Sequence, residues 1–268
     1  MSTGTYSGRG FDIHYEIVGD GPRLFFFNGS GSSIEAARPL IDMVARFCTV
    51  LVHDQRGLGR TDVPEGPYEM ADYAQDASGL LEHVGWDRVA TLGISFGGMV
   101  ALEFAVTNPE MVERLAVLCT SSGGVGGSSY PLHELAALSE ADRAARYPTL
   151  VDSRFDDVWL NEHPGDRALL VPRPAPQGRA ALGHHWQLDA RSRHDVWDRL
   201  GRISAPTFVA SGTYDGIAPP RNGRAISDRI AGSFHTEYEG GHMFLLQDRR
   251  AFSDVRSFLV GGRGEETR

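Results

Sequence analysis

Ser95 stands at the centre of the pentapeptide Gly-Ile-Ser-Phe-Gly, residues 93–97, where an apolar run changes character. Residues 87–94 have the continuous apolar pattern of a buried strand, and residues 97–109 have the small and apolar spacing of a packed helix. A G-x-S-x-G pattern on a strand-to-helix turn holds the serine hydroxyl above a sheet. The N–H of Phe96, where the helix begins, could donate to developing negative charge. We therefore expect Ser95 to be a nucleophile and Phe96 to supply one oxyanion-hole donor.

Two further polar residues follow strands that are predicted later in the chain. Asp215 comes after the apolar run 207–211, and His242 follows the last predicted strand after two glycines. Each has an ordinary alternative, because Asp-Gly is common in turns and the chain has 10 histidines. Side chains at the carboxyl ends of parallel strands converge on one edge of a sheet. The order nucleophile, acid, base therefore predicts a catalytic triad of Ser95, Asp215 and His242.

The loop after the apolar strand predicted at residues 23–27 is rich in small residues. It reads Asn28, Gly29, Ser30 and Gly31. Acyl transfer needs a second oxyanion donor from such a loop, and the Ser30 N–H is the candidate, with the other three residues supporting the loop. The alternative is a dinucleotide-binding loop, because Asp54 ends the next predicted strand. Ile34 stands where that motif has its third glycine, which disfavours this alternative.

Alternating strands and helices must position these residues. Strands are predicted at residues 11–19, 23–27, 48–54, 89–94, 114–120, 205–212 and 233–241. Helices are predicted at residues 33–47, 69–85, 97–109, 220–232 and 248–260. This alternation predicts a mainly parallel sheet that is covered by helices on both faces.

The alternation is interrupted in the middle of the chain. A connector rich in glycine and serine begins at Ser121, and residues from about 132 to 200 are mostly helical and polar. We expect a helical lid at residues 123–200, inserted into a core of residues 1–122 and 201–262. Residues 263–268 are expected to form a flexible tail.

Composition excludes several classes of function. The net charge of −9 comes without any basic cluster, which argues against a nucleic-acid partner or an anionic membrane surface. All 26 basic residues are arginine, so no lysine is available for a Schiff base or a phosphate-binding loop. Cys48 and Cys119 lack metal-site spacing and are expected to be buried free thiols. With no signal-peptide pattern and no run of about 20 apolar residues, we expect a cytoplasmic protein.

Together, these motifs resemble those of α/β-hydrolase-fold enzymes across nearly the whole chain. The matching segments are residues 28–31, 54–62, 93–97, 212–220 and 240–244. Within that superfamily the chain is similar to the branch of 3-oxoadipate enol-lactonases, esterases and cofactor-free haloperoxidases. The resemblance implies a mainly parallel eight-stranded sheet with flanking helices and an inserted lid. It also implies a serine hydrolase that cleaves a small carboxylic ester or lactone, with no cofactor and no metal. Relatives usually carry His-Gly where this chain has Asn28-Gly29.

The same triad leaves other activities open. A perhydrolase or haloperoxidase would pass the acyl group to peroxide. An aminopeptidase of the proline-iminopeptidase type would need acidic lid residues to hold the substrate amine, and the candidates are Asp152, Asp156, Asp157 and Glu162. A slow or non-catalytic ligand receptor of the same fold is an alternative of another class.

Candidate pocket residues lie in the predicted lid and directly after the strand predicted at residues 114–120. The candidates are Ser121, His184, His185 and Trp186. The competing interpretation of the three lid residues is a solvated helix face with one buried tryptophan. Arg56, in the segment 54–62, is expected to brace that loop rather than to bind substrate.

Overall fold

The computed structural model describes residues 1–170 and 176–261, so the predicted tail at 263–268 lies outside the described residues. Within the described residues, eight strands form one sheet in the order β1-β2-β4-β3-β5-β6-β7-β8. Their bounds are β1 Ser2–Tyr6, β2 Ile13–Val18, β3 Arg23–Phe27, β4 Thr49–His53, β5 Val89–Ile94, β6 Val112–Leu118, β7 Thr207–Gly212 and β8 Phe234–Tyr238. β1 and β2 pair antiparallel, whereas β3 to β8 pair with one another in parallel. The mainly parallel eight-stranded sheet is therefore confirmed.

The seven strands predicted individually correspond to β2 through β8, and β1 is not among them. Its residues are small or polar apart from Tyr6, so they carry no apolar run. They become a strand because all five pair with β2, from Ser2 opposite Ile17 to Tyr6 opposite Ile13. Pairing with a neighbour, rather than local composition, decides this element.

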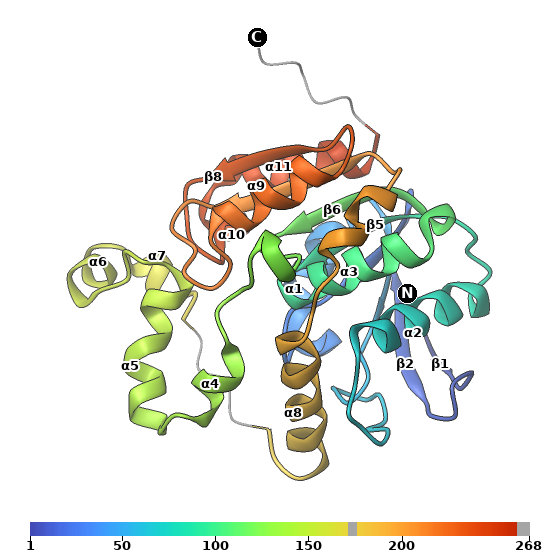
Figure 1. The fold of residues 1–268 in the computed structure, drawn as a ribbon, viewed down its shortest axis with the longest axis horizontal. Helices are drawn as coiled ribbons and strands as arrows, with labels where there is room; N and C mark the ends of the chain where they lie inside the picture. Colours follow the sequence, from blue (N-terminus) through green and yellow to red (C-terminus); the bar gives the residue numbers. More distant parts are fainter. Residues whose placement is uncertain (171–175, 262–268) are drawn as a thin grey trace.

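Helices cover both faces of the sheet (Figure 1). Those of the described residues are α1 Ile34–Val44, α2 Met70–His83, α3 Phe96–Thr107, α4 Leu132–Ala137, α5 Glu140–Val151, α6 Asp157–Glu162, α7 Pro164–Arg167, α8 Arg179–Ser192, α9 Pro220–Arg229, α10 Phe244–Gln247 and α11 Arg249–Leu259. Short 3-10 helices span Pro109–Met111, Gly124–Gly126 and Trp197–Arg202. Buried side chains of α2, α3 and α9 pack in one core cluster, and those of α1 and α11 pack in the other. No helix of the described chain is both long enough and apolar enough to cross a bilayer.

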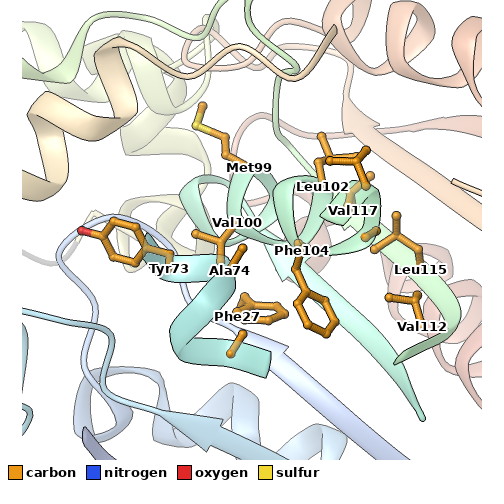
Figure 2. Packing of buried hydrophobic residues seen from close by; sticks show 14 of the residues in the cluster. Phe27, Tyr73, Ala74, Met99, Val100, Leu102, Phe104, Val112, Leu115 and Val117 are labelled. Atoms are coloured by element: carbon orange, nitrogen blue, oxygen red, sulfur yellow. The ribbon is translucent and has the colours of Figure 1, made fainter. Parts of the chain in front are cut away.

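α3 is the central helix, and it fixes the turn that carries Ser95. All its residues from Phe96 to Val106 are buried, as expected for a helix that is apolar around its whole circumference. Phe104 packs with Phe27 of β3, their ring centroids 5.9 Å apart (Figure 2). Glu103, the one acidic residue of α3, is paired with Arg199 at 2.6 Å. A helix held on every side gives its first residues a rigid position.

The helices α4 to α8 lie between β6 and β7 in the chain, where the sequence predicts an insertion. α8 packs closely on the loop after β4, because a Cβ on Gly57 would lie 2.7 Å from Cα of Gly183. The end of α5 contacts the loop after β8, since the N–H of His242 donates to the carbonyl of Val151 at 2.6 Å. The inserted segment therefore touches loops at the carboxyl ends of the strands.

Candidate active site

Ser95 occupies a sharp turn between β5 and α3. Its backbone has φ 57° and ψ −117°, a conformation that a residue with a Cβ rarely adopts. The turn is held because the N–H of Ser95 donates to Leu118 at 2.9 Å, and the Thr120 hydroxyl donates to the carbonyl of Ser95 at 2.7 Å. Gly97 is required here, because any Cβ at that position would overlap the carbonyl oxygen of Phe27. The strained turn holds the serine hydroxyl at the edge of the sheet.

The structure brings Ser95, Asp215 and His242 together. Nε2 of His242 lies 3.0 Å from Oγ of Ser95, and Nδ1 lies 2.8 Å from Oδ2 of Asp215. The other oxygen of Asp215 accepts from the N–H groups of Ile217 and Ala218, both at 2.8 Å. Two backbone donors and the imidazole therefore hold the Asp215 carboxylate in a fixed orientation, although its side chain is fully buried. The arrangement can move a proton from Ser95 to His242 while Asp215 orients the ring.

The loop after β3 lies directly against this serine. A Cβ built on Gly29 would lie 3.7 Å from the Cβ of Ser95. In the described part of the chain, neither the N–H of Ser30 nor that of Phe96 donates to another residue. Both donors therefore remain available to a ligand near Ser95.

Two glutamines that the sequence analysis did not identify hold this loop. Nε2 of Gln55 donates to the carbonyl of Asn28 at 3.0 Å, and the N–H of Gly31 donates to Oε1 of Gln187 at 2.7 Å. Nε2 of Gln187 in turn donates to Oε1 of Gln55 at 3.2 Å. Both glutamines are fully buried. Gln187 lies on α8, so the inserted segment takes part in shaping the loop.

Asn28 contacts its neighbours through its main chain rather than through its side-chain nitrogen. Its Nδ2 atom is buried and has no hydrogen-bond partner among the described residues. The carbonyl of Asn28, rather than its amide, anchors the loop through Gln55. A sequence signal for Gln55 exists, because it lies inside the segment 54–62 that resembles the family. No sequence signal identifies Gln187. It is a polar residue on a predicted helix, and only the structure shows that its face of the helix is buried.

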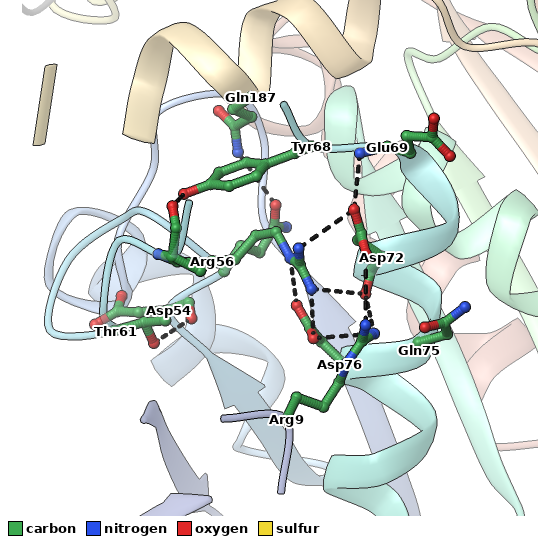
Figure 3. Close-up of polar contacts among 12 residues, drawn as sticks. Arg9, Asp54, Arg56, Thr61, Tyr68, Glu69, Asp72, Gln75, Asp76 and Gln187 are labelled. Atoms are coloured by element: carbon green, nitrogen blue, oxygen red, sulfur yellow. Dashed lines mark hydrogen bonds and ion pairs between the residues drawn. The ribbon is translucent and has the colours of Figure 1, made fainter. Parts of the chain in front are cut away.

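Arg56 links its loop to α2, as the sequence suggests (Figure 3). Its Nε and Nη2 donate to the two carboxylate oxygens of Asp76 at 2.7 and 2.8 Å. The guanidinium also lies 5.3 Å from the ring centroids of Phe11 and Tyr68. Partners therefore occupy Arg56 on several sides, which fits a brace for the loop.

Only one of the four predicted pocket residues lines a cavity found in the described structure. Ser121 lines a cavity of about 270 Å³ between the sheet edge and the inserted segment, but His184, His185 and Trp186 do not. His184 is half-buried beside Gly31, His185 is exposed, and Trp186 packs near Tyr68. The part of α8 that reaches this cavity is its last turn, at Arg191 and Ser192, and substrate contact by the three predicted residues stays a prediction.

Two triad residues and a neighbouring cysteine are side chains of the kinds that can bind a metal ion. The ligand atoms of Cys119, Asp215 and His242 all lie within 4.8 Å of one another. Burial raises the pKa of the Cys119 thiol well above its usual value, so this sulfur stays protonated and is a poor ligand. Cys48 is also buried and free, and burial raises its pKa to about 11. The donor set therefore favours proton transfer over metal binding.

Known proteins resemble this chain over most of its length. A family model described as the alpha/beta hydrolase fold matches residues 22–248. The chain is 25% identical to a poly(3-hydroxyalkanoate) depolymerase of Ectopseudomonas oleovorans, over 87% of this chain and 82% of the relative. It is 25% identical to a proline iminopeptidase of Lactobacillus helveticus, over 89% and 90%. An enol-lactonase structure from Burkholderia xenovorans matches with a TM-score of 0.77 at 23% identity, covering 96% of this chain and 99% of that one, which is a likeness of fold.

Proposed function

Because the chain belongs to the alpha/beta hydrolase fold family, we propose that it is a serine hydrolase that cleaves a small carboxylic ester or lactone. The observation that carries the proposal is the unbroken hydrogen-bonded series from Asp215 through His242 to Ser95. The depolymerase among its relatives is consistent with ester chemistry. In this proposal the three residues are catalytic, and the N–H groups of Ser30 and Phe96 form the oxyanion hole.

In the first half-reaction, Oγ of Ser95 attacks the carbonyl carbon while its proton passes to Nε2 of His242. Asp215 stabilises the imidazolium that forms. The carbonyl oxygen becomes an oxyanion, which accepts hydrogen bonds from Ser30 and Phe96. Collapse breaks the bond to the leaving oxygen, which takes the proton from His242. In a lactone, the leaving alcohol stays attached to the acyl group.

In the second half-reaction, water attacks the acyl carbon and gives a proton to His242. The same two N–H groups hold the second oxyanion, and its collapse returns the proton to Oγ of Ser95. The acid leaves and the enzyme is restored. Residues 123–200 are the proposed lid, since Val151 and Gln187 contact the loops of His242 and Ser30. Neither step uses a cofactor or a metal.

An aminopeptidase is the second candidate, because a proline iminopeptidase is among the relatives. The acidic residues that could hold an amine are partly occupied. Both oxygens of Asp152 accept from Arg154, at 2.9 and 2.7 Å, and Asp156 caps α6 by accepting from the N–H of Trp159. Asp152 and Asp156 are therefore already held by groups of the chain itself, which leaves Asp157 and Glu162 as the candidates for binding an amine.

The test compares wild type with Ser95→Ala. Wild type should react with a fluorophosphonate and turn over p-nitrophenyl esters or lactones, and the variant should do neither while keeping its fold. Labelling of the variant at the wild-type rate would refute Ser95 as the nucleophile. A single persistent adduct without turnover would indicate a ligand receptor. A preference for amino-acid arylamides would indicate an aminopeptidase, and acyl transfer to peroxide would indicate a perhydrolase.

A further inference from the structure

The end of α5 is hydrogen-bonded to both loops that carry the acid and the base of the triad. The carbonyl of Leu150 accepts from the N–H of Gly216 at 3.0 Å. The carbonyl of Val151 accepts from the N–H of His242 at 2.6 Å. The last carbonyls of a helix have no partner inside the helix. Here two of them are paired with the N–H of the base and with that of the residue after Asp215, so the end of α5 is fixed to both loops.

Two glycines leave room for these carbonyls. A Cβ on Gly216 would lie 2.9 Å from the carbonyl oxygen of Leu150. A Cβ on Gly241 would overlap the carbonyl oxygen of Val151. Neither glycine has a positive φ. Space for the end of α5, rather than a left-handed backbone, is therefore what these two positions need.

Gln247, the last residue of α10, adds a side-chain link between the inserted segment and the loop of His242. Its Oε1 accepts from the N–H of Gly241 at 2.9 Å. Its Nε2 donates to Oδ2 of Asp152 at 3.1 Å and to Oδ1 of Asp166 at 3.2 Å. Only this orientation of the amide satisfies all three partners, because carboxylates accept and a backbone N–H donates. Gln247 therefore connects two positions of the inserted segment to the residue that precedes the base.

Asp152 is held rigidly by its other contacts. Its side chain is fully buried, and both of its oxygens accept from Arg154. The guanidinium of Arg154 lies 3.8 Å from the ring centroid of Tyr214, which directly precedes the acid of the triad. The N–H of Ser153 also donates to the carbonyl of Tyr214 at 2.9 Å. Residues 150–153 are thus held against the acid loop as well as against the base loop.

We infer that residues 150–153 and Gln247 form a clamp on the acid and base loops of the triad, and that Gln247 is a positioning residue for the proposed hydrolysis. This inference rests on the proposed function and adds a supporting residue to it. The position of the base matters because the proton of Ser95 can pass to His242 only across a hydrogen bond. By this inference the inserted segment supports the triad itself, in addition to the proposed oxyanion loop.

The test compares wild type with Gln247→Met, which keeps the length of the side chain but loses all three hydrogen bonds. A catalytic group displaced by about 1 Å can cost about 100-fold in rate. Gln247→Met should therefore lower kcat on the best ester by about 10- to 100-fold, with KM nearly unchanged because the base acts in the chemical step. The rate at which a fluorophosphonate labels Ser95 should fall by a similar factor. Gly241→Ala should do the same, since its Cβ would displace the carbonyl of Val151.

The matched control is Arg167→Ala in α7. It removes the hydrogen bonds from Arg167 to the carbonyl of Leu160 at 3.2 Å and to Oδ1 of Asn161 at 2.7 Å, so it weakens the inserted segment away from the clamp. The control should keep the wild-type kcat and labelling rate. An equal loss in Arg167→Ala, or a wild-type kcat and labelling rate in Gln247→Met, would overturn the inference.

Amide hydrogen exchange separates this inference from the proposed function, because it reports on the clamp without any substrate. In wild type the N–H groups of Gly216, Gly241 and His242 should exchange slowly, since each donates to a carbonyl oxygen of the backbone or of a side chain. Gln247→Met should speed exchange at His242 as well as at Gly241, and Arg167→Ala at neither. If wild type reacts with no ester or fluorophosphonate but shows this pattern, the proposed function fails and the clamp stands. Wild-type exchange at His242 in Gln247→Met would show that Gln247 does not position the base, and the inference would be wrong.

Discussion

Gln187 and Gln55 are joined by a hydrogen bond of 3.2 Å although 132 residues separate them in the chain. Gln187 comes from the inserted helix α8, and Gln55 comes from the loop after β4. Through Gly31 and Asn28, the pair holds both ends of the loop that carries Ser30. The geometry of the proposed oxyanion hole therefore depends on the position of α8.

Gln187→Leu should lower kcat while leaving KM nearly unchanged, because the loop matters mainly when the oxyanion forms. A directly contributing oxyanion donor is worth about 10²–10³ in kcat, so a residue acting through the loop should cost less, about tenfold. Asn28→Ala should cost less again, since its side-chain nitrogen has no partner in the described structure. The measurement is kcat and KM on the best ester, with the exposed Gln75→Leu as control. A larger loss for Asn28→Ala than for Gln187→Leu would assign the brace to Asn28.

Asp76→Ala should destabilise the protein strongly, because it leaves the guanidinium of Arg56 buried without its main partner. The side chains of Arg56 and Asp76 are 5% and 1% exposed. Breaking a buried pair of this kind costs about 3–5 kcal/mol in the free energy of unfolding. The exposed pair of Arg193 and Asp189 should contribute only about 0–1 kcal/mol. Urea unfolding of Asp76→Ala and Asp189→Ala gives both values, and equal losses would contradict a buried structural role for Arg56.

Arg191→Met should stabilise the protein, because it removes a buried charge whose Nε and Nη2 have no partner among the described residues. Replacing buried ionic groups by apolar residues of similar volume often gains about 1–4 kcal/mol. Thermal unfolding measures the change. A fall in Tm would show that the hydrogen bond from Arg191 to the carbonyl of Tyr130 outweighs the burial of the charge.

Acid should destabilise the fold through two buried histidines. Burial lowers the pKa of both His53 and His194 from 6.5 to about 4. Between these values the unfolded chain binds protons that the folded chain does not, so the free energy of unfolding must fall as the pH drops from 6.5 towards 4. Each histidine can lower the free energy of unfolding by about 3 kcal/mol as the pH falls through that range.

Urea unfolding at pH 7 and at pH 5 tests this pH dependence. His53→Phe should weaken it, because phenylalanine cannot be protonated and the position already packs beside Phe25 and Phe27. An equal pH dependence in wild type and in His53→Phe would exclude His53 as a source.

The sequence alone was enough to predict the sheet and the grouping of Ser95, Asp215 and His242. The reason is local, since each of the three follows a strand, and the ends of parallel strands lie along one edge. The turn at Ser95 is likewise local, because its glycines and the change from strand to helix are adjacent in the chain. β1 was missed, since only its pairing with β2 makes it a strand.

The partners of a polar side chain were decided by tertiary structure. The segment 54–62 indicates that Arg56 braces a loop, but it does not identify Asp76 as its partner. Nothing in the sequence around Arg191 indicates that its Nε and Nη2 are buried without a partner among the described residues. Gln55 and Gln187 meet only because the inserted helix packs on a distant loop. Such contacts depend on the distance and orientation between elements that are far apart in the chain. The pattern of residue types determines neither the distance nor the orientation.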